Sequence, residues 1–179
     1  YRNLEGAFAI MANGALILQF PLAHSFLLSK RGQKILSLLG PKDLAISLST
    51  TSFTIVASIQ LFVLFMLWSP SKIVFELPFE FLIYILPILY CLSWFLLIVA
   101  TIDAGLEVQS GALGWISVVA RKKPKFPELP TTGLYRVIRH PIYASFFLAV
   151  LTVPTWSADQ FVVSLILGAY CISVSYTHL

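Results

Sequence analysis

Residues 79–102 read FEFLIYILPILYCLSWFLLIVATI, and Glu80 is the only charged side chain among them. A helix that crosses a bilayer needs about 20 predominantly apolar residues, so this segment is long enough to span. Pro87 does not argue against a helix, because membrane helices tolerate proline. The whole chain has the same character: 58% of its 179 residues are hydrophobic and 11% are charged. Soluble domains carry about 25% charged residues, so the composition predicts an integral membrane protein and excludes a soluble enzyme, a disordered chain and a nucleic-acid-binding domain.

Four further apolar segments surround this one, and they cover residues 6–28, 44–68, 142–154 and 160–174. The last two are short for a membrane span, and a turn at residues 156–159, with Asp159 as a turn former, joins them. We therefore expect an all-α fold, a polytopic membrane helical bundle with about five transmembrane helices, the last two forming a short helical hairpin. Serine and threonine crowd the second span, where small side chains let membrane helices pack closely. Residues 103–120 fit either an interfacial helix or a cytosolic extension of the third span.

The two ends of the chain and its cysteines carry further expectations. The chain begins with Tyr1 rather than Met, and residues 175–179 resemble translated adapter sequence. We expect a single membrane domain over residues 1–174 that is truncated at both ends, followed by a non-native tail over residues 175–179. Cys91 and Cys171 both lie inside apolar runs, so they predict neither a disulfide framework nor a metal site.

Basic residues are concentrated in two loops. Residues 29–43 contain four Lys or Arg, residues 103–141 contain six, and the loop between the second and third spans contains only Lys72. The positive-inside rule places the two basic loops in the cytoplasm. Five spans then alternate across the bilayer with the N-terminus outside and the C-terminus inside, and we expect that bilayer to be a bacterial inner membrane.

The richest polar stretch is GLYRVIRHPIY at residues 133–143, at the cytosolic start of the fourth span. Pro141 suits the first position of a helix, where its missing N–H costs nothing. The free N–H groups of that first turn, with the two arginines of the stretch, form a site for an anion such as a carboxylate. His140 and Tyr143 lie three residues apart and can share a helix face. A simpler interpretation is that the arginines are positive-inside anchors and the tyrosines an interfacial belt.

This stretch resembles the G-x-Y-R-x-x-R-H-P-x-Y signature of the isoprenylcysteine carboxyl methyltransferase-like superfamily, whose members are integral membrane enzymes that use S-adenosylmethionine. The resemblance covers most of residues 16–174 and extends toward the branch of methanethiol S-methyltransferases and NnrU-type proteins. Three stretches carry that extension: Ala23-His24-Ser25, the Ser/Thr-rich second span that ends in Leu67-Trp68-Ser69-Pro70, and the run from Tyr143 to Pro154-Thr155.

The resemblance implies an integral membrane methyltransferase that takes S-adenosyl-L-methionine as cofactor from the cytoplasmic side. It would methylate a small or lipophilic acceptor, for which we expect a thiol. Methyl transfer from a sulfonium needs positioning more than strong acid–base groups. The implied cofactor-binding residues all lie in the signature: His140, Tyr143, Arg139, Pro141, Tyr135 and Arg136. Neither a catalytic residue nor a metal ligand follows from the resemblance.

Two features depart from the superfamily pattern. Its members continue past the last helix into a Glu-Glu-containing cytosolic segment that closes the cofactor pocket, whereas this chain stops at Leu179. In the methanethiol-methylating branch the stretch corresponding to residues 102–107 is more aromatic and holds a His-Phe pair, whereas this chain has Asp103 and Glu107 there. These carboxylates lie four residues apart and share a helix face, which either faces a substrate pocket or forms the solvated side of an interfacial helix.

His24 lies inside the first apolar segment, where an ionisable side chain is a functional hypothesis by default. Three roles are open to it: packing or hydrogen bonding, lining a substrate pocket, and ligating haem iron. Haem ligation belongs to the alternative function, an NnrU-type membrane protein that is a haem-binding isomerase or an accessory factor rather than a methyltransferase. A sterol-reductase relative is a third alternative, but there Asn typically follows the proline of the motif, whereas this chain has Ile142.

Overall fold

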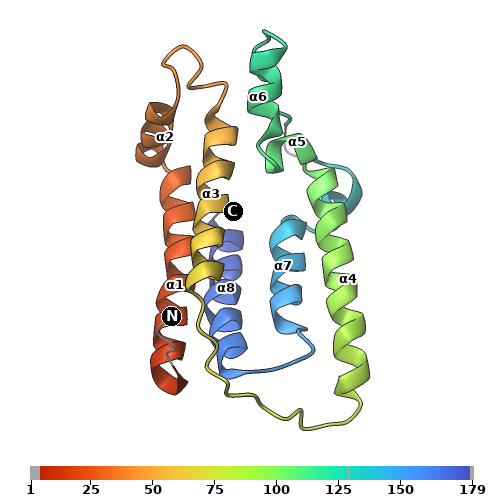
Figure 1. Cartoon of the computed structure of the whole chain (residues 1–179). Coiled ribbons are helices and arrows are strands. Elements are labelled where there is room, and N and C mark those ends of the chain that lie inside the picture. The colour runs from red at the N-terminus through yellow and green to blue at the C-terminus, as the bar shows by residue number, and fades with distance from the viewer. Residues whose placement is uncertain (1–4, 129, 178–179) are drawn as a thin grey trace.

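The computed structural model describes residues 5–128 and 130–177 (Figure 1). Its long helices are α1 (Gly6–Leu28), α3 (Ser49–Leu67), α4 (Leu82–Asp103) and α8 (Ala158–Thr177). Its shorter helices are α2 (Lys30–Leu36), η1 (Ser37–Leu39), α5 (Leu106–Gln109), α6 (Ala112–Val119), η2 (Gly133–Arg136) and α7 (Pro141–Leu151). The described residues contain one isolated antiparallel bridge, between Val74 and Ser157, and no longer strand. The predicted all-α fold is confirmed.

Four of the described helices, α1, α3, α4 and α8, are long and apolar enough to cross a membrane. The polytopic helical bundle is therefore confirmed, although the full-length spans number four where we expected about five. The difference is α7, whose 11 residues cover about 16 Å of a bilayer core of about 30 Å. It ends at Leu151, shortly before Pro154, which disfavours helical backbone at the residue ahead of it.

The hairpin of α7 and α8 forms, since the two helices pack against each other, but its second helix is not short. Helix α8 has 20 residues, because it begins at Ala158 and takes Asp159 into its first turn. The expected turn at residues 156–159 thus ends earlier than the sequence indicates. The helix continues through Thr177, while residues 178 and 179 of the expected tail lie outside the described residues.

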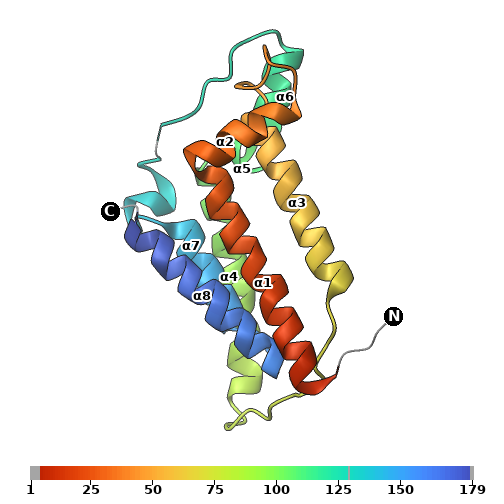
Figure 2. The same cartoon turned by 90° about the vertical axis from the view of Figure 1, so that its left-hand side faces the viewer.

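The helices pack in a row in the order α4, α7, α8, α1 and α3, each against the next (Figures 1 and 2). The connection from α3 to α4 runs along the end of the bundle opposite α2 and α6 and passes the start of α8 (Figure 1). There Phe75 N donates to Trp156 O, and Ala158 N donates to Ile73 O, both at 2.9 Å. These contacts attach the connection to the α7–α8 hairpin.

Within residues 103–120, Asp103 ends α4 and the rest contain two short helices, α5 and α6, rather than one. Gly105 and Gly111 take φ angles of 90° and 74°, which favour glycine and interrupt the helix. Helix α6 then packs on α3, where Thr51 Oγ1 donates to Gly111 O at 2.6 Å. An ideal Cβ on Gly114 would lie 2.6 Å from Ser47 O, so the absence of a side chain allows this approach. The small residues at and just before the second span therefore serve close packing, as the sequence predicts.

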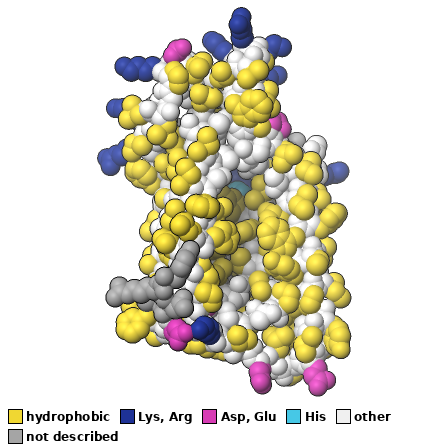
Figure 3. All heavy atoms as spheres, in the orientation of Figure 1, with side chains coloured by type: hydrophobic (Ala, Val, Ile, Leu, Met, Phe, Trp, Pro, Cys, Tyr) yellow, Lys and Arg dark blue, Asp and Glu magenta, His cyan; other side chains and the backbone are white. Residues whose placement is uncertain are grey.

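Charged side chains lie toward the two ends of the bundle, and hydrophobic side chains cover its middle (Figure 3). Lys and Arg gather at the end that carries α2 and α6, which we call the basic end. The opposite end holds the start of α1 and the α3–α4 connection (Figure 1), and with them Glu5 (paired to Lys72), Glu76 and Glu80. The basic runs of residues 29–43 and 121–125 thus share one end, as an alternating topology requires.

A buried polar cluster joins α1 and α8 near the end opposite the basic end. Asn13 is 0% exposed, and its Nδ2 donates to Ser69 O and to Asp159 Oδ1, both at 2.8 Å. The second carboxylate oxygen of Asp159 accepts from Ser71 N at 2.8 Å and from Ser71 Oγ at 2.7 Å. Asp159 is thus a buried acceptor inside a helix rather than a turn former. We call these four residues the Asp159 cluster, and it fixes α1, α8 and the α3–α4 connection together.

Candidate functional site

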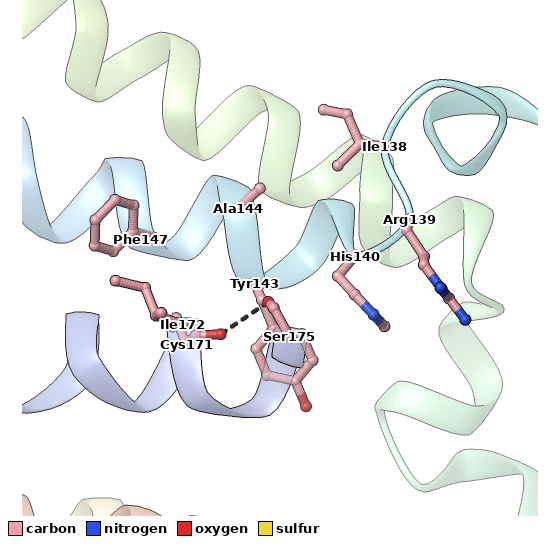
Figure 4. Close-up of a pocket in the computed structure, with 9 residues that line it drawn as sticks. All are labelled: Ile138, Arg139, His140, Tyr143, Ala144, Phe147, Cys171, Ile172 and Ser175. Atoms are coloured by element: carbon pink, nitrogen blue, oxygen red, sulfur yellow. Dashed lines mark hydrogen bonds between the residues drawn. The ribbon is translucent and has the colours of Figure 1, made fainter. Parts of the chain in front are cut away.

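The signature stretch, residues 133–143, forms η2, a short connection and the first turn of α7. Pro141 occupies the start of α7, as predicted, and its side chain is fully buried. His140 directly precedes it with a φ of −130°. The rings of His140 and Tyr143 lie edge to face with their centroids 6.3 Å apart, so these two side chains do share one side of the helix start (Figure 4).

Asp103, at the end of α4, holds the turn that precedes this helix. Its Oδ2 accepts from Leu134 N at 2.8 Å. Gly133 has a φ of 60°, and a Cβ there would collide with the same carboxylate, so both the backbone angle and the contact require glycine. Burial, followed by the negative charge of Asp103, raises the pKa of Tyr135 above its ordinary value. Asp103 therefore positions the signature, and it lines neither of the cavities described below.

The larger cavity has a volume of about 740 Å³ and is bounded by α1, α7, α8 and the signature. It brings together five of the residues that the sequence indicates: His24, Tyr135, Arg139, His140 and Tyr143. The rest of its lining is mostly apolar or aromatic: Phe20, Gln109, Pro130, Ile142, Phe146, Leu167, Tyr170 and Cys171. The other indicated residues do not line it: Arg136, Pro141, Asp103 and Glu107. In Figure 3 the surface is hollowed between α3 and α4, and histidine atoms are visible at the floor of the hollow.

A second cavity, of about 540 Å³, adjoins the first. The two share Arg139, His140, Tyr143 and Cys171 as a common boundary. The remaining lining of the second cavity is mainly apolar: Ile138, Ala144, Phe147, Ile172 and Ser175 (Figure 4). Ligands bound in the two cavities would therefore be neighbours, and the smaller cavity suits an apolar group.

His24 stands on the α1 wall of the larger cavity, surrounded by aromatic rings. The centroid of its ring lies 5.7 Å from that of Phe20, 4.8 Å from that of Phe53 and 6.4 Å from that of Tyr170. These rings come from α1, α3 and α8, so three helices hold the imidazole in place. The structure thus places His24 in the same cavity as the signature.

The permanent charge on the described lining of the two cavities is positive. Among the described residues that line them, Arg139 is the one permanently charged side chain, and none is Asp or Glu. An anionic group entering the larger cavity would meet a cation that no lining carboxylate neutralises. Charge-assisted hydrogen bonds of this kind are about twice as strong as neutral ones, so the arrangement favours an anionic ligand group.

Phe20, Tyr170 and Cys171 are among the lining residues of the larger cavity that the sequence does not indicate. Phe20 lies four residues before His24, so helical spacing from the histidine could have identified it. Tyr170 and Cys171 sit in the apolar run of α8, where nothing in the local sequence marks a site. They become site residues only through the packing of α8 on α1 and α7.

These observations define a polytopic α-helical membrane protein whose main cavity combines a cation, two histidines and several aromatic rings. A methanethiol S-methyltransferase of Pseudomonas deceptionensis is 25% identical to it over 158 residues, which are 88% of this chain and 59% of that protein. A methanethiol S-methyltransferase of Pseudomonas sp. (strain GM41(2012)) is 22% identical over 163 residues, 90% of this chain and 61% of that protein. The chain is thus a distant homologue of proteins named as methyltransferases, and it spans about three-fifths of their length. No protein-family model and no solved structure matches it.

Proposed function

We propose that this chain belongs to an integral membrane methyltransferase that uses S-adenosyl-L-methionine and methylates a small or lipophilic acceptor, with a thiol as the expected acceptor. The observation that carries this proposal is the larger cavity, where Arg139, His140 and Tyr143 of the signature meet His24 of α1. The names of the two distant relatives support the kind of activity.

The larger cavity fits the chemistry of this cofactor, which carries a carboxylate and a sulfonium cation. Arg139 and the free N–H groups at the start of α7 suit the carboxylate. Tyr143 and Tyr170 also line the cavity, and their aromatic rings suit a cation. The volume of about 740 Å³ also lies within the range of about 300–1,000 Å³ that is usual for small-molecule sites.

The bound cofactor would supply a methyl group on a positively charged sulfur, and the residues of this chain would bind and orient it. We assign the amino-acid end to Arg139, with His140 and Tyr143 as the walls beside it. Pro141 is buried and fixes where α7 begins. Arg136 lines neither cavity, so we assign it no contact with the cofactor. The positive-inside rule places the signature on the cytoplasmic face of what we expect to be a bacterial inner membrane.

Calorimetric titration with S-adenosylhomocysteine, the demethylated cofactor, tests this proposal on protein purified in detergent. We expect saturable binding that is about 10- to 100-fold weaker in Arg139→Ala, because a hydrogen bond to a charged group contributes about 1.5–3 kcal/mol. Arg136→Ala is the matched control, since it removes the same side chain three positions earlier and outside both cavities. Absence of binding to the unaltered protein, or an equal loss in the two variants, would contradict the proposal.

A further inference from the structure

The two ring nitrogens of His24 have different surroundings. Nδ1 is buried and has no hydrogen-bond partner among the described residues. Nε2 is not buried in this way, and His24 lines the larger cavity. Nε2 is therefore the nitrogen that can meet a ligand there, while Phe20, Phe53 and Tyr170 hold the ring from the sides.

The described residues that line the cavity supply no anion that would stabilise a positive charge on this imidazole. The titratable or charged groups that line the cavity with it are Arg139, His140, Tyr135, Tyr143, Tyr170 and Cys171. None of these described groups is a carboxylate, and Arg139 already contributes a positive charge. These surroundings favour the neutral imidazole, which has one nitrogen free to accept a proton.

The proposed reaction needs such a group. The nucleophile in sulfur chemistry is the thiolate, and an ordinary thiol is mostly protonated at neutral pH. A thiol that enters an apolar cavity must pass its proton to a base inside it. Arginine cannot accept a proton, and a tyrosine phenol or a cysteine thiol accepts one only after ionising. His24 and His140 remain, and His140 lies at the signature next to Tyr143, where we place the cofactor.

We propose that His24 is the general base that deprotonates the thiol acceptor, an inference that rests on the function proposed above. The thiol proton moves to Nε2 of His24, and the sulfur lone pair forms the new bond to the transferred methyl carbon. The electrons of the bond that breaks return to the donor sulfur, which becomes neutral. The imidazolium afterwards releases its proton to water, which restores the neutral side chain. The structure thereby gives the two walls of the cavity different tasks, cofactor binding at the signature and acceptor activation at α1.

Two thiols that differ in their need for a base separate this role from a structural one. Methanethiol must lose a proton, whereas 4-nitrothiophenol is already ionised at neutral pH. General base catalysis contributes about 100-fold or more, so His24→Ala should slow methylation of methanethiol by about that factor and methylation of 4-nitrothiophenol by less than about threefold. His24→Gln, which retains a polar side chain, should behave in the same way.

Phe20→Leu is the matched control, because it changes the same wall one helical turn away and removes no proton acceptor. It should not slow methanethiol selectively, because it leaves the proposed base in place. The affinity of each variant for S-adenosylhomocysteine reports folding and the cofactor site, and it should stay within about twofold for His24→Ala, since His24 is outside the signature. Loss of both thiol reactions by an equal factor in His24→Ala would overturn the assignment of a base.

A measurement without turnover complements the kinetics. Diethyl pyrocarbonate acylates neutral imidazole, and peptide mass spectrometry distinguishes His24 from His140. Dimethyl sulfide, the thioether product of methanethiol, should slow acylation of His24 about tenfold when present at ten times its dissociation constant. An unchanged acylation rate would overturn the placement of the acceptor at His24. Absence of S-adenosylhomocysteine binding to the unaltered protein would overturn the proposed function and this inference together, whereas intact binding with equal thiol losses overturns the inference alone.

Discussion

Replacing Asp159 with alanine should lower the free energy of unfolding by about 2–6 kcal/mol, because it leaves buried hydrogen-bond donors without their acceptor. The residue is 7% exposed, and its carboxylate accepts three hydrogen bonds of 2.7–2.8 Å from Asn13 Nδ2, Ser71 N and Ser71 Oγ. Alanine leaves the buried Ser71 N–H and one hydrogen of the Asn13 amide without this acceptor. Each buried polar group that loses its partner costs about 1–3 kcal/mol, so these two groups alone account for about 2–6 kcal/mol.

Reversible unfolding in mixed micelles, followed by circular dichroism as the fraction of dodecyl sulfate rises, measures this loss. Glu76→Ala removes an exposed carboxylate at the same end of the bundle, and it should change stability by no more than about 0.5 kcal/mol. Asp159 lies about 18 Å along the axis of α8 from Cys171 of the cavities, so affinity for S-adenosylhomocysteine should persist in the folded variant. A loss of stability below about 1 kcal/mol would refute the reasoning that Asp159 satisfies buried donors.

Three further predictions concern the half of the molecule nearer the basic end. Gly114→Ala should lower the unfolding free energy by about 1–3 kcal/mol in the same titration, because its Cβ would lie 2.6 Å from a backbone oxygen. Gly40→Ala is the control and should be nearly neutral, since its Cβ would meet a side-chain carbon at 3.6 Å. Gly133→Ala should weaken S-adenosylhomocysteine binding about tenfold or more by calorimetry, because strain of about 1–3 kcal/mol at its positive φ displaces the turn from Asp103. Burial, and then Asp103, raises the pKa of Tyr135 above 10.0, so the folded chain holds the phenol proton more tightly than the unfolded chain. The linked stability is present below pH 10 and falls as the pH rises above it, and Asp103→Asn should lower this phenol pKa in an ultraviolet absorbance titration.

The long helices could be predicted from the sequence because the bilayer sets the length of an apolar run. Residues 79–102 differ from helix α4, Leu82–Asp103, by three positions at the start and one at the end. The start of α8 could not be predicted in this way. Ser157 caps the helix, because its Oγ accepts from Gln160 N at 3.1 Å. The donors to Asp159 in the first turn come from Asn13, 146 positions away, and from the α3–α4 connection. The spacing of Ser157 and Gln160 is a local helix-start signal, but no local pattern shows hydrogen-bond donors that come from a distant segment.

The candidate site likewise has one part that could be predicted from the sequence and one part that depends on packing. The signature is contiguous, so its residues and the helix start at Pro141 follow from the sequence. His24 could be singled out as an ionisable residue in an apolar segment, but only the packing of α1 on α8 brings it to the cavity that His140 lines. The same two helices are fixed at their other end by the Asp159 cluster. The distance between the proposed base and the proposed cofactor site is therefore set by how α1 crosses α8. A change to that crossing should impair methyl transfer more than the binding of either ligand, because only the transfer requires the two walls to stand at a fixed separation.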